Sequence, residues 1–475
     1  MTKSGFLPTS LVDISSDYSL HPFAERLAPL IHETLTALDK DKERRGTKLV
    51  SSFVIWLVLA LSLRRDLSSF AVLNWMISGW RWLVCSLPKQ LLSEGTISHA
   101  RVRVGIQVFK VLFHRVVETF EPLPTDFYDR ISVVFDGSTG TMPDSEVNAQ
   151  KFGKAKSRRE SEKSAYPRLR WMNLLAVSNR LLLGISYDAS VGKGTGERTL
   201  MMKILENLHY SNLLFLADAG LYSILMMYTI QQQGAAFLVK VSSHPPLPVE
   251  KLLPDGSYLS TMKGKIVDKD ASTDTHKKWK EVEVPVRVIT YQLKGWRPCR
   301  LVTNLLDDKI SARELVLHYH KRWDVEICLD EIKTHQCATL RGQMPTLFRS
   351  KRPDLVEQEL YAMMLSYNLV REMMLESTIP GPEDPLLLSF LNCLQIVIEA
   401  IPQLSKLMSP QEIEHGYNYL FRLISEAGID RPRRQRINER VVKVKMSKFK
   451  RKTSKHKSQP GDIFHSFQIV IPELT

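Results

Sequence analysis

The chain has 475 residues, of which 44% are hydrophobic and 24% charged. These are the proportions of an ordinary globular protein of two to four domains, and they exclude a strongly biased composition. The formal net charge is +14, but twelve basic residues and one acid, Glu439, lie between Arg433 and Lys457, leaving 53 basic and 50 acidic residues elsewhere. Charge concentrated in this way predicts an arm that contacts a polyanion.

The cysteine pattern argues against a disulfide framework and against a thiolate zinc site. There are five cysteines, an odd number, and no pair has the spacing CxxC. This usage fits a reducing cytoplasm. The N-terminus has no signal-peptide pattern, and the longest apolar run, Phe53 to Leu63, is too short to span a membrane. We interpret this run as a buried helix and expect no membrane association.

The first 125 residues predict helices, at 23–38, 53–63 and 67–82, without convincing strand alternation. Two interpretations stay open for this region. It could bind DNA through a helix placed in the major groove, or it could be a structural helical cap.

From Ile131 the pattern changes to short β-branched and apolar runs that alternate with helices. The order is three strands, helix, strand, helix, strand, which predicts an α/β fold with a ribonuclease H-like mixed sheet. The strands are expected at 131–135, 169–178, 181–187, 212–217 and 235–241, and the helices at 197–208 and 222–233.

Two aspartates follow strands of this predicted sheet. Asp136 follows the first strand and begins DGSTG, a turn-like sequence, and Asp218 follows the fourth strand in the turn DAG. These two strands are neighbours in the predicted topology, so the two carboxylates could meet in one crevice. Each Asp taken alone is also an ordinary turn residue.

The remaining chain predicts an inserted β segment and further helices. Residues 242–297 are rich in Pro, Lys, Asp and Thr with alternating segments, a strand is expected at 300–304, and helices at 354–376, 385–400 and 410–427. The predicted domains are a helical region at 1–125, a catalytic domain at 126–241 and 298–376, a β insertion at 242–297, a helical region at 377–430 and a basic tail at 431–475.

The segment Ser311 to Thr334 has no Pro or Gly and predicts one helix. Tyr319, Arg322, Glu326 and Lys333 follow one another at steps of three, four and seven, which keep side chains on one helical face. Carboxylates are hard oxygen ligands for Mg²⁺ or Mn²⁺, and three of them can hold two ions about 3.5–4 Å apart. Asp330 lies four residues beyond Glu326 and could be the third ligand instead.

The spacing Tyr, two residues, Arg, three residues, Glu, six residues, Lys resembles the signature of DDE transposases of the insertion-sequence-four family. The segment LADAGLYS around Asp218 and the segment that begins at Asp136 are similar to the family's two Asp segments, although Leu221 replaces the usual first aromatic. The resemblance covers about residues 130–375. It implies that Asp136, Asp218 and Glu326 are catalytic and bind two Mg²⁺ or Mn²⁺ ions.

The resemblance also implies cut-and-paste movement of a DNA element by a transposase that acts as a homodimer on terminal inverted repeats and target DNA. Tyr319, Arg322 and Lys333 would contact phosphates near the cleaved end. Trp296 or Trp323 would stack on a displaced base, although packing in the core is the competing interpretation for both tryptophans.

Two alternatives stay open at this stage. One is a ribonuclease H-like nuclease that cuts DNA without strand transfer, and the other is an inactive DNA-binding protein. The expected location is the bacterial cytoplasm, at the nucleoid when the protein is bound to DNA.

Overall fold

The described part of the chain divides into two compact units. The first comprises Met1–Pro124, Asp136–Ile204 and Asp324–Gly428, and the second Thr125–Phe135, Leu205–Trp323 and Ile429–Thr475. The computed structural model describes residues 18–44, 47–78, 92–154, 166–208, 211–242, 246–268, 278–293, 297–337, 346–379, 384–405, 409–428 and 467–472.

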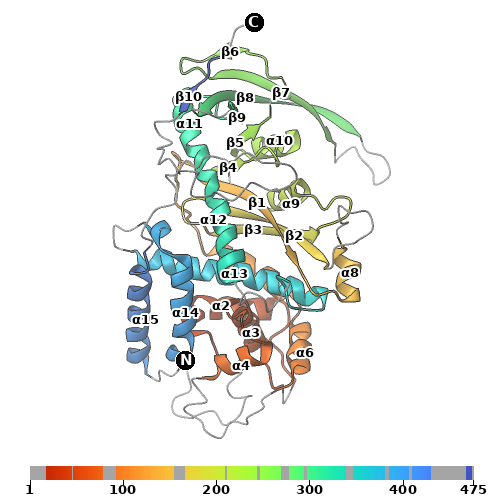
Figure 1. Cartoon of the computed structure of the whole chain (residues 1–475), viewed down its shortest axis with the longest axis vertical. Helices are drawn as coiled ribbons and strands as arrows, with labels where there is room; N and C mark the ends of the chain where they lie inside the picture. Colours follow the sequence, from red (N-terminus) through yellow and green to blue (C-terminus); the bar gives the residue numbers. More distant parts are fainter. Residues whose placement is uncertain are drawn as a thin grey trace, which may run out of the picture. The chain divides into compact units, whose positions relative to one another are not determined.

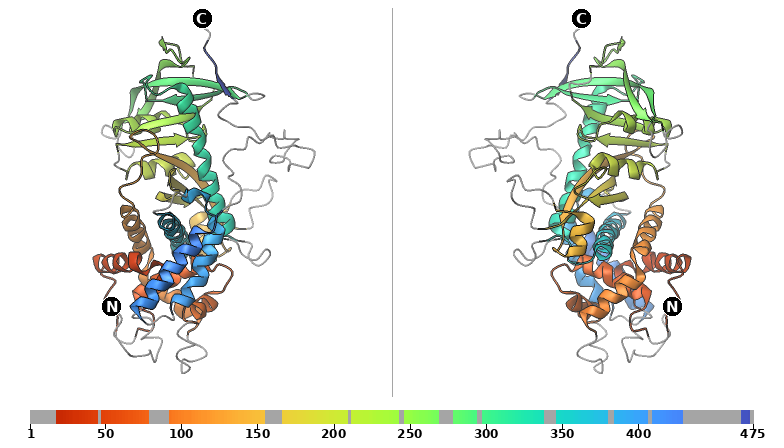
Figure 2. Two further views of the ribbon diagram at one scale, coloured as in Figure 1. Left: turned by 90° about the vertical axis from the view of Figure 1, so that its left-hand side faces the viewer. Right: turned by 90° about the vertical axis from the view of Figure 1, so that its right-hand side faces the viewer.

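Helices build most of the first unit, as predicted for the N-terminal region (Figures 1 and 2). Helix α13, Pro353–Ser377, runs for 25 residues and contacts helices from both ends of the chain. The other helices are α2 (His21–Ala37), α3 (Ser51–Leu63), α4 (Ser69–Met76), α6 (Glu94–Val104), α7 (Ile106–Glu118), α8 (Glu146–Phe152), α9 (Glu197–Leu205), α12 (Asp324–Asp330), the π-helix η2 (Glu331–Gln336), the 3₁₀-helix η3 (Pro385–Leu387), α14 (Phe390–Leu404) and α15 (Pro410–Ser425).

Helix α3 is the buried helix that its sequence predicts. All of its residues except Ser52 are buried. The side chain of Ser62 in α3 lies against α13, where Ser62 Oγ is 2.6 Å from Ser366 Oγ. An apolar helix of 13 residues therefore forms core inside the unit. None of the helices in the described part of the chain is both long and apolar enough to cross a bilayer.

The strand order confirms the predicted ribonuclease H-like mixed sheet. The order is β3-β2-β1-β4-β5-β9-β8-β7-β6, with β2 and β3 antiparallel and β1, β4 and β5 parallel (Figure 1). Strand β1 contributes its first five residues to the second unit and the rest to the first. The core strands are β1 (Ile131–Thr141), β2 (Arg168–Ala176), β3 (Leu182–Ala189), β4 (Leu213–Ala217) and β5 (Ala236–Val241).

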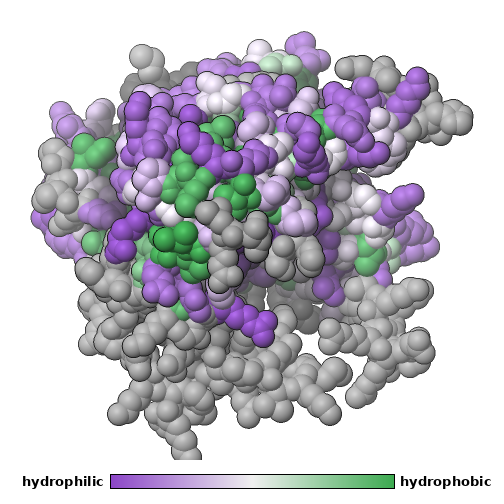
Figure 3. All heavy atoms as spheres, turned by 90° about the horizontal axis from the view of Figure 1, so that it is seen from above, coloured by the Kyte–Doolittle hydropathy of each residue, from purple (hydrophilic) through white to green (hydrophobic). Residues whose placement is uncertain are grey.

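In the second unit the predicted β insertion continues the same sheet. Strand β9 pairs antiparallel with β5, and β8 and β7 follow it in antiparallel order. One long strand, β8, forms within the alternating sequence of this insertion. A further strand, β10, near the C-terminus pairs with β8. The face in Figure 3 is mainly hydrophilic with a small hydrophobic group, which is ordinary for a protein surface. The elements are β6 (Lys251–Leu252), β7 (Tyr258–Val267), β8 (Trp279–Leu293), β9 (Cys299–Thr303), β10 (Phe467–Ile469), α10 (Ile224–Gln232), α11 (Ala312–Tyr319) and the 3₁₀-helix η1 (His320–Trp323).

A buried carboxylate ties the N-terminal helices to α13 in the first unit. Glu359 of α13 lies 3.9 Å from guanidinium nitrogens of both Arg65 and Arg101. Burial opposes its charge, but Arg101, Arg65 and Arg349 hold the pKa of Glu359 below its ordinary value. Arg349 in turn donates 2.7 Å hydrogen bonds to the carbonyl oxygens of Leu61 and Leu67. The carboxylate therefore neutralises cations that join three separate segments.

We expect Glu359→Gln to lower the free energy of unfolding by about 3–5 kcal/mol, because it leaves buried guanidinium groups without their counter-charge. Thermal and urea unfolding would measure the loss. Glu414→Gln, which removes an exposed carboxylate from α15, is the matched control and should change stability by less than about 0.5 kcal/mol. Equal stability of the two variants would contradict this role.

Candidate active site

Two of the three predicted carboxylates follow the paired stretch of β1 and β4. The parallel register runs from Ile131 opposite Leu213 to Val134 opposite Leu216. Asp136 and Asp218 each stand two residues beyond that last pair. Asp218 is exposed and its Oδ1 accepts a 2.7 Å hydrogen bond from the amide of Ala219.

The expected turn after Asp136 is wrong, because β1 continues to Thr141 and Asp136 lies inside the strand. Its Oδ1 accepts a 2.7 Å hydrogen bond from the amide of Gly137. The glycines that suggested a turn instead allow close packing. A Cβ at Gly140 would lie 2.6 Å from side-chain atoms of both Leu347 and Phe348.

The sequence predicted one helix for the segment that carries the four-residue signature. The segment is helical, but it is not a single α-helix. It passes from α11 through the 3₁₀-helix η1 into α12 and then into the π-helix η2. Because 3₁₀- and π-turns wind differently from α-helix, steps of three, four and seven no longer define one regular face. Each signature residue is therefore described by its own contacts.

Tyr319 supports the strand end that precedes Asp218, within the second unit. Its side chain is only 4% exposed, and its hydroxyl donates a 3.3 Å hydrogen bond to the carbonyl oxygen of Ala217. Burial raises the pKa of Tyr319 above its ordinary value, so the hydroxyl stays a donor at neutral pH. This contact joins the end of α11 to the residue immediately before Asp218.

Arg322 stacks with the aromatic residues on either side of it in the second unit. Its guanidinium carbon lies 5.9 Å from the ring centroid of Tyr319 and 5.2 Å from that of Trp323. Trp323 is 44% exposed, so it presents a ring face or edge to solvent and is not a core residue. Trp296 lies outside the described residues.

The other half of the signature belongs to the first unit. Glu326 of α12 is exposed, and Lys333 of η2 is exposed and donates a 2.8 Å hydrogen bond from Nζ to Ser138 Oγ. Ser138 stands two residues beyond Asp136 on β1, so the two side chains project from the same face of the strand. Lys333 therefore contacts β1 on the face that carries Asp136.

The alternative third ligand, Asp330, interacts with the π-helix η2 that follows it. Its Oδ1 accepts a 2.6 Å hydrogen bond from Thr334, and its Oδ2 lies 3.9 Å from His335 Nε2. The side chain is exposed, as is that of Glu326. These contacts give Asp330 a local structural role.

Sequence reasoning missed a buried anchor directly beside these acids. Glu331 is 6% exposed and forms an ion pair with Arg371 of α13, while the hydroxyl of Tyr367 donates a 2.9 Å hydrogen bond to it. Arg180, in the β2–β3 turn, lies 3.4 Å away. Burial alone would lower the pKa of Arg371, but Glu331 raises it, so the guanidinium stays charged. Glu331 therefore fixes η2 onto α13.

Two histidines near the signature carry no charge at neutral pH. Burial lowers the pKa of His318 to about 3 and that of His320 to about 4. His318 Nε2 lies 2.5 Å from Ser132 Oγ, and the nearby charge of Lys321 adds to the effect of burial on the pKa of His318. Positive charge in this stretch therefore comes from lysine and arginine side chains.

The donor set suits a hard divalent cation, because carboxylate oxygens are the ligands that Mg²⁺ and Mn²⁺ prefer. Asp136 and Glu326 belong to the first unit and Asp218 to the second. In the described part of the chain, no three His, Cys, Asp or Glu side chains are grouped closely enough to hold a metal ion.

Comparison with known proteins gives matches across most of the chain. The transposase DDE domain family matches residues 129–369, slightly more than half of the chain, and the N-terminal region of insertion element 4 transposases matches residues 18–114. The chain is 25% identical over 341 residues to the transposase InsG for insertion sequence element IS4 of Escherichia coli strain K12, which covers 70% of this chain and 71% of that protein.

A solved structure of the piggyBac transposase, in a synaptic complex with hairpin DNA, is also similar. It shares 10% sequence identity with a TM-score of 0.42, over 86% of this chain and 87% of that chain.

We expect Tyr319→Phe to cost about 1 kcal/mol of stability, because the carbonyl of Ala217 loses its hydrogen-bond donor. Amide hydrogen exchange should become faster over residues 217–222, which include Asp218. Tyr128→Phe removes an exposed hydroxyl that donates to Glu314 in the same unit and serves as the control. Unchanged exchange at 217–222 in Tyr319→Phe would count against this support.

The pKa of His318 predicts a loss of stability in mild acid. Between pH 6.5 and 3 the unfolded chain binds a proton that the folded protein excludes, so stability falls as the pH drops below about 6.5. From pH 7.5 to 5 this loss should be on the order of 1–2 kcal/mol. Urea unfolding should show a flatter pH dependence for His318→Gln and no change for His415→Gln, which alters an exposed histidine of α15.

Proposed function

Because the chain belongs to the transposase DDE domain family, we propose that Asp136, Asp218 and Glu326 are the catalytic, metal-binding carboxylates of this DNA transposase. Membership of the family confirms the resemblance predicted from the four-residue signature and the function of a DNA transposase. The proposal rests on the parallel register of β1 and β4. On each strand an aspartate, Asp136 or Asp218, lies two residues beyond the last pair of this register.

Two Mg²⁺ or Mn²⁺ ions bound there would activate the attacking water or 3′-hydroxyl and stabilise the leaving oxygen of the phosphodiester. The chain's own part is to hold three carboxylates on separate elements. Asp136 comes from within β1, Asp218 from the turn after β4, and Glu326 from α12. Strands and a helix are rigid supports, which suits a site that must hold metal ligands in fixed positions.

Cations of the signature are proposed to bind the DNA backbone. Lys333 has an exposed ammonium that can exchange its hydroxyl partner Ser138 for a phosphate oxygen. Arg322, stacked between Tyr319 and Trp323, is held in a fixed orientation for a phosphate. Tyr319 already donates its hydroxyl to Ala217, so a phosphate contact would require it to change partner.

An exposed aromatic side chain suits a displaced base. Trp323 is supported in this role by its exposed ring beside Arg322, because bases stack on aromatic faces and gain from a nearby cation. Trp296, the first candidate on the resemblance, stays a candidate on that ground alone.

The proposed reaction is cut-and-paste transposition, with cleavage at the ends of an insertion sequence and transfer of the 3′ ends into target DNA. Two ends must be held together, so the protein is proposed to work as a homodimer on double-stranded DNA. The relative from Escherichia coli supports a bacterial setting, in the cytoplasm and at the nucleoid when the protein is bound to DNA.

Glu326→Gln should reduce metal-dependent excision and joining at least a thousandfold, roughly 4 kcal/mol of transition-state stabilisation, because it removes a charged metal ligand. Asp330→Asn is the matched control, since it changes an exposed acid four residues away and should retain activity. The assay uses purified protein and a plasmid carrying the gene's own flanking DNA, with Mg²⁺ and with EDTA. Full activity of Glu326→Gln together with loss in Asp330→Asn would reverse the assignment.

A further inference from the structure

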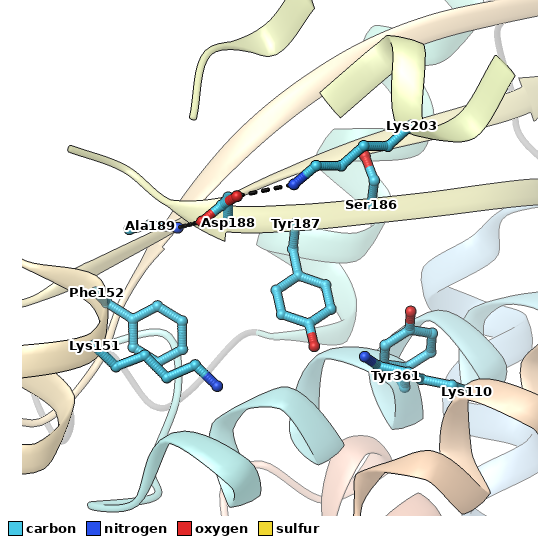
Figure 4. A pocket seen from close by; sticks show the side chains of 9 residues that line it. All are labelled: Lys110, Lys151, Phe152, Ser186, Tyr187, Asp188, Ala189, Lys203 and Tyr361. Atoms are coloured by element: carbon cyan, nitrogen blue, oxygen red, sulfur yellow. Dashed lines mark hydrogen bonds and ion pairs between the residues drawn. The ribbon is translucent and has the colours of Figure 1, made fainter. Parts of the chain in front are cut away.

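A cavity of about 300 Å³ opens in the first unit among α7, α8, β3, α9 and α13 (Figure 4). None of the residues that line it belongs to the four-residue signature. Three of its lining residues are lysines, and each comes from a different helix: Lys110 from α7, Lys151 from α8 and Lys203 from α9.

Two of these lysines have carboxylate partners and one does not. Lys203 Nζ lies 2.9 Å from Asp188 Oδ2, and Lys151 forms an ion pair with Glu357. Among the described residues no carboxylate pairs with Lys110. Its ammonium instead lies 5.4 Å from the ring centroid of Tyr187. Three ammonium groups against two carboxylates leave a net charge of +1, which one phosphodiester would neutralise.

Aromatic side chains form the floor of the cavity and supply hydroxyl donors. The rings of Tyr187 and Tyr361 meet edge to face with centroids 6.0 Å apart (Figure 4). Burial, with Glu357 adding to it, raises the pKa of both hydroxyls, so both remain protonated. Rigid O–H donors beside an ammonium group are a favourable setting for a phosphate oxygen.

The cavity lies a short distance across the sheet from Asp136, within the same unit. Tyr187 is paired with Trp171 in the β2–β3 register. A Cβ at Gly137, next to Asp136, would lie 3.2 Å from the carbonyl oxygen of Trp171. Tyr187 on β3 is therefore separated from Gly137 on β1 by two strand spacings, which puts their backbones roughly 10 Å apart. A phosphate held in the cavity would therefore lie within a few nucleotides of a phosphate held at Asp136.

We propose that this cavity binds a backbone phosphate of DNA within a few nucleotides of the phosphate that is cleaved, with Lys110 as its main cation. The proposal rests on the proposed function, since it takes the DNA to be cut at Asp136. Free phosphate shares the same chemistry, and the experiment separates the two sources.

The experiment measures binding of a duplex carrying the element's terminal DNA as a function of KCl concentration. Loss of one phosphate contact reduces the slope of log affinity against log salt by about 0.9. Lys110→Gln should show this reduction and weaker binding, and Lys110→Arg should restore the slope. Lys42→Gln removes an exposed lysine paired with Asp39 in the same unit and should leave the slope unchanged. An unchanged slope in Lys110→Gln would overturn the proposal.

Position is tested with duplexes that carry one neutral methylphosphonate at a time. One position within a few nucleotides of the cleavage point should weaken binding of the native protein and have no effect on Lys110→Gln. If inorganic phosphate raises the melting temperature through Lys110 while no methylphosphonate position depends on Lys110, the occupant is free phosphate and the proposal fails.

Failure of this proposal can be distinguished from failure of the proposed function. If the native protein shows metal-dependent excision but Lys110→Gln leaves the salt slope unchanged, only the proposal for the cavity is wrong. If the native protein shows no excision activity that is lost in Glu326→Gln, the proposed function is wrong. If Lys110→Gln does not fold, Lys151→Gln, which alters an exposed lysine of the same cavity, takes its place under the same slope criterion.

Discussion

The parallel pairing of β1 with β4 is the constraint on which the positions of both aspartates depend. All eight residues in the register are buried, including Ser132, whose amide donates a 2.7 Å hydrogen bond to Asp126. A slip of one residue would turn every side chain of the strand, including Asp136, to the opposite face. The register therefore decides which face of the sheet receives Asp136.

In the first unit, buried charged side chains fix the positions of the helices relative to one another. Helix α13 carries two such sites, Glu359 for the arginines of the N-terminal helices and Arg371 for Glu331 of η2. The N-terminal region and the segment that carries Lys333 are thus anchored to the same helix. Buried ion pairs contribute little net stability compared with apolar packing, but removing one partner is costly, so they favour one arrangement over its alternatives.

The sequence was informative where a pattern reflects local physics. Apolar runs located the strands of the sheet, and spacing identified the signature. Prediction failed where tertiary packing overrides local preference. Gly137 and Gly140 indicate a turn by composition, yet in β1 they allow neighbouring groups to approach closely. The burial of Glu331 depends on Arg371, forty residues away in the chain, and no local signal reports it.

Winding of the helical segment was equally hidden, because 3₁₀- and π-turns share the residue preferences of an α-helix. The strand β10 also had no signal, since three residues after a basic stretch are too few for a periodicity to be read. The contacts of Tyr319 with Ala217 and of Lys333 with Ser138 became visible only with the fold.

The π-helical winding of Glu331–Gln336 makes the length of this segment as important as its composition. A π-turn accommodates one residue more than the α-helical hydrogen-bond pattern, and each residue of an α-helix turns the chain by about 100°. Deleting any one residue between Glu326 and Lys333 could restore regular winding, but it would turn Lys333 away from Ser138 even if every remaining side chain were unchanged. Relatives of this chain should therefore tolerate substitutions in this interval more readily than insertions or deletions.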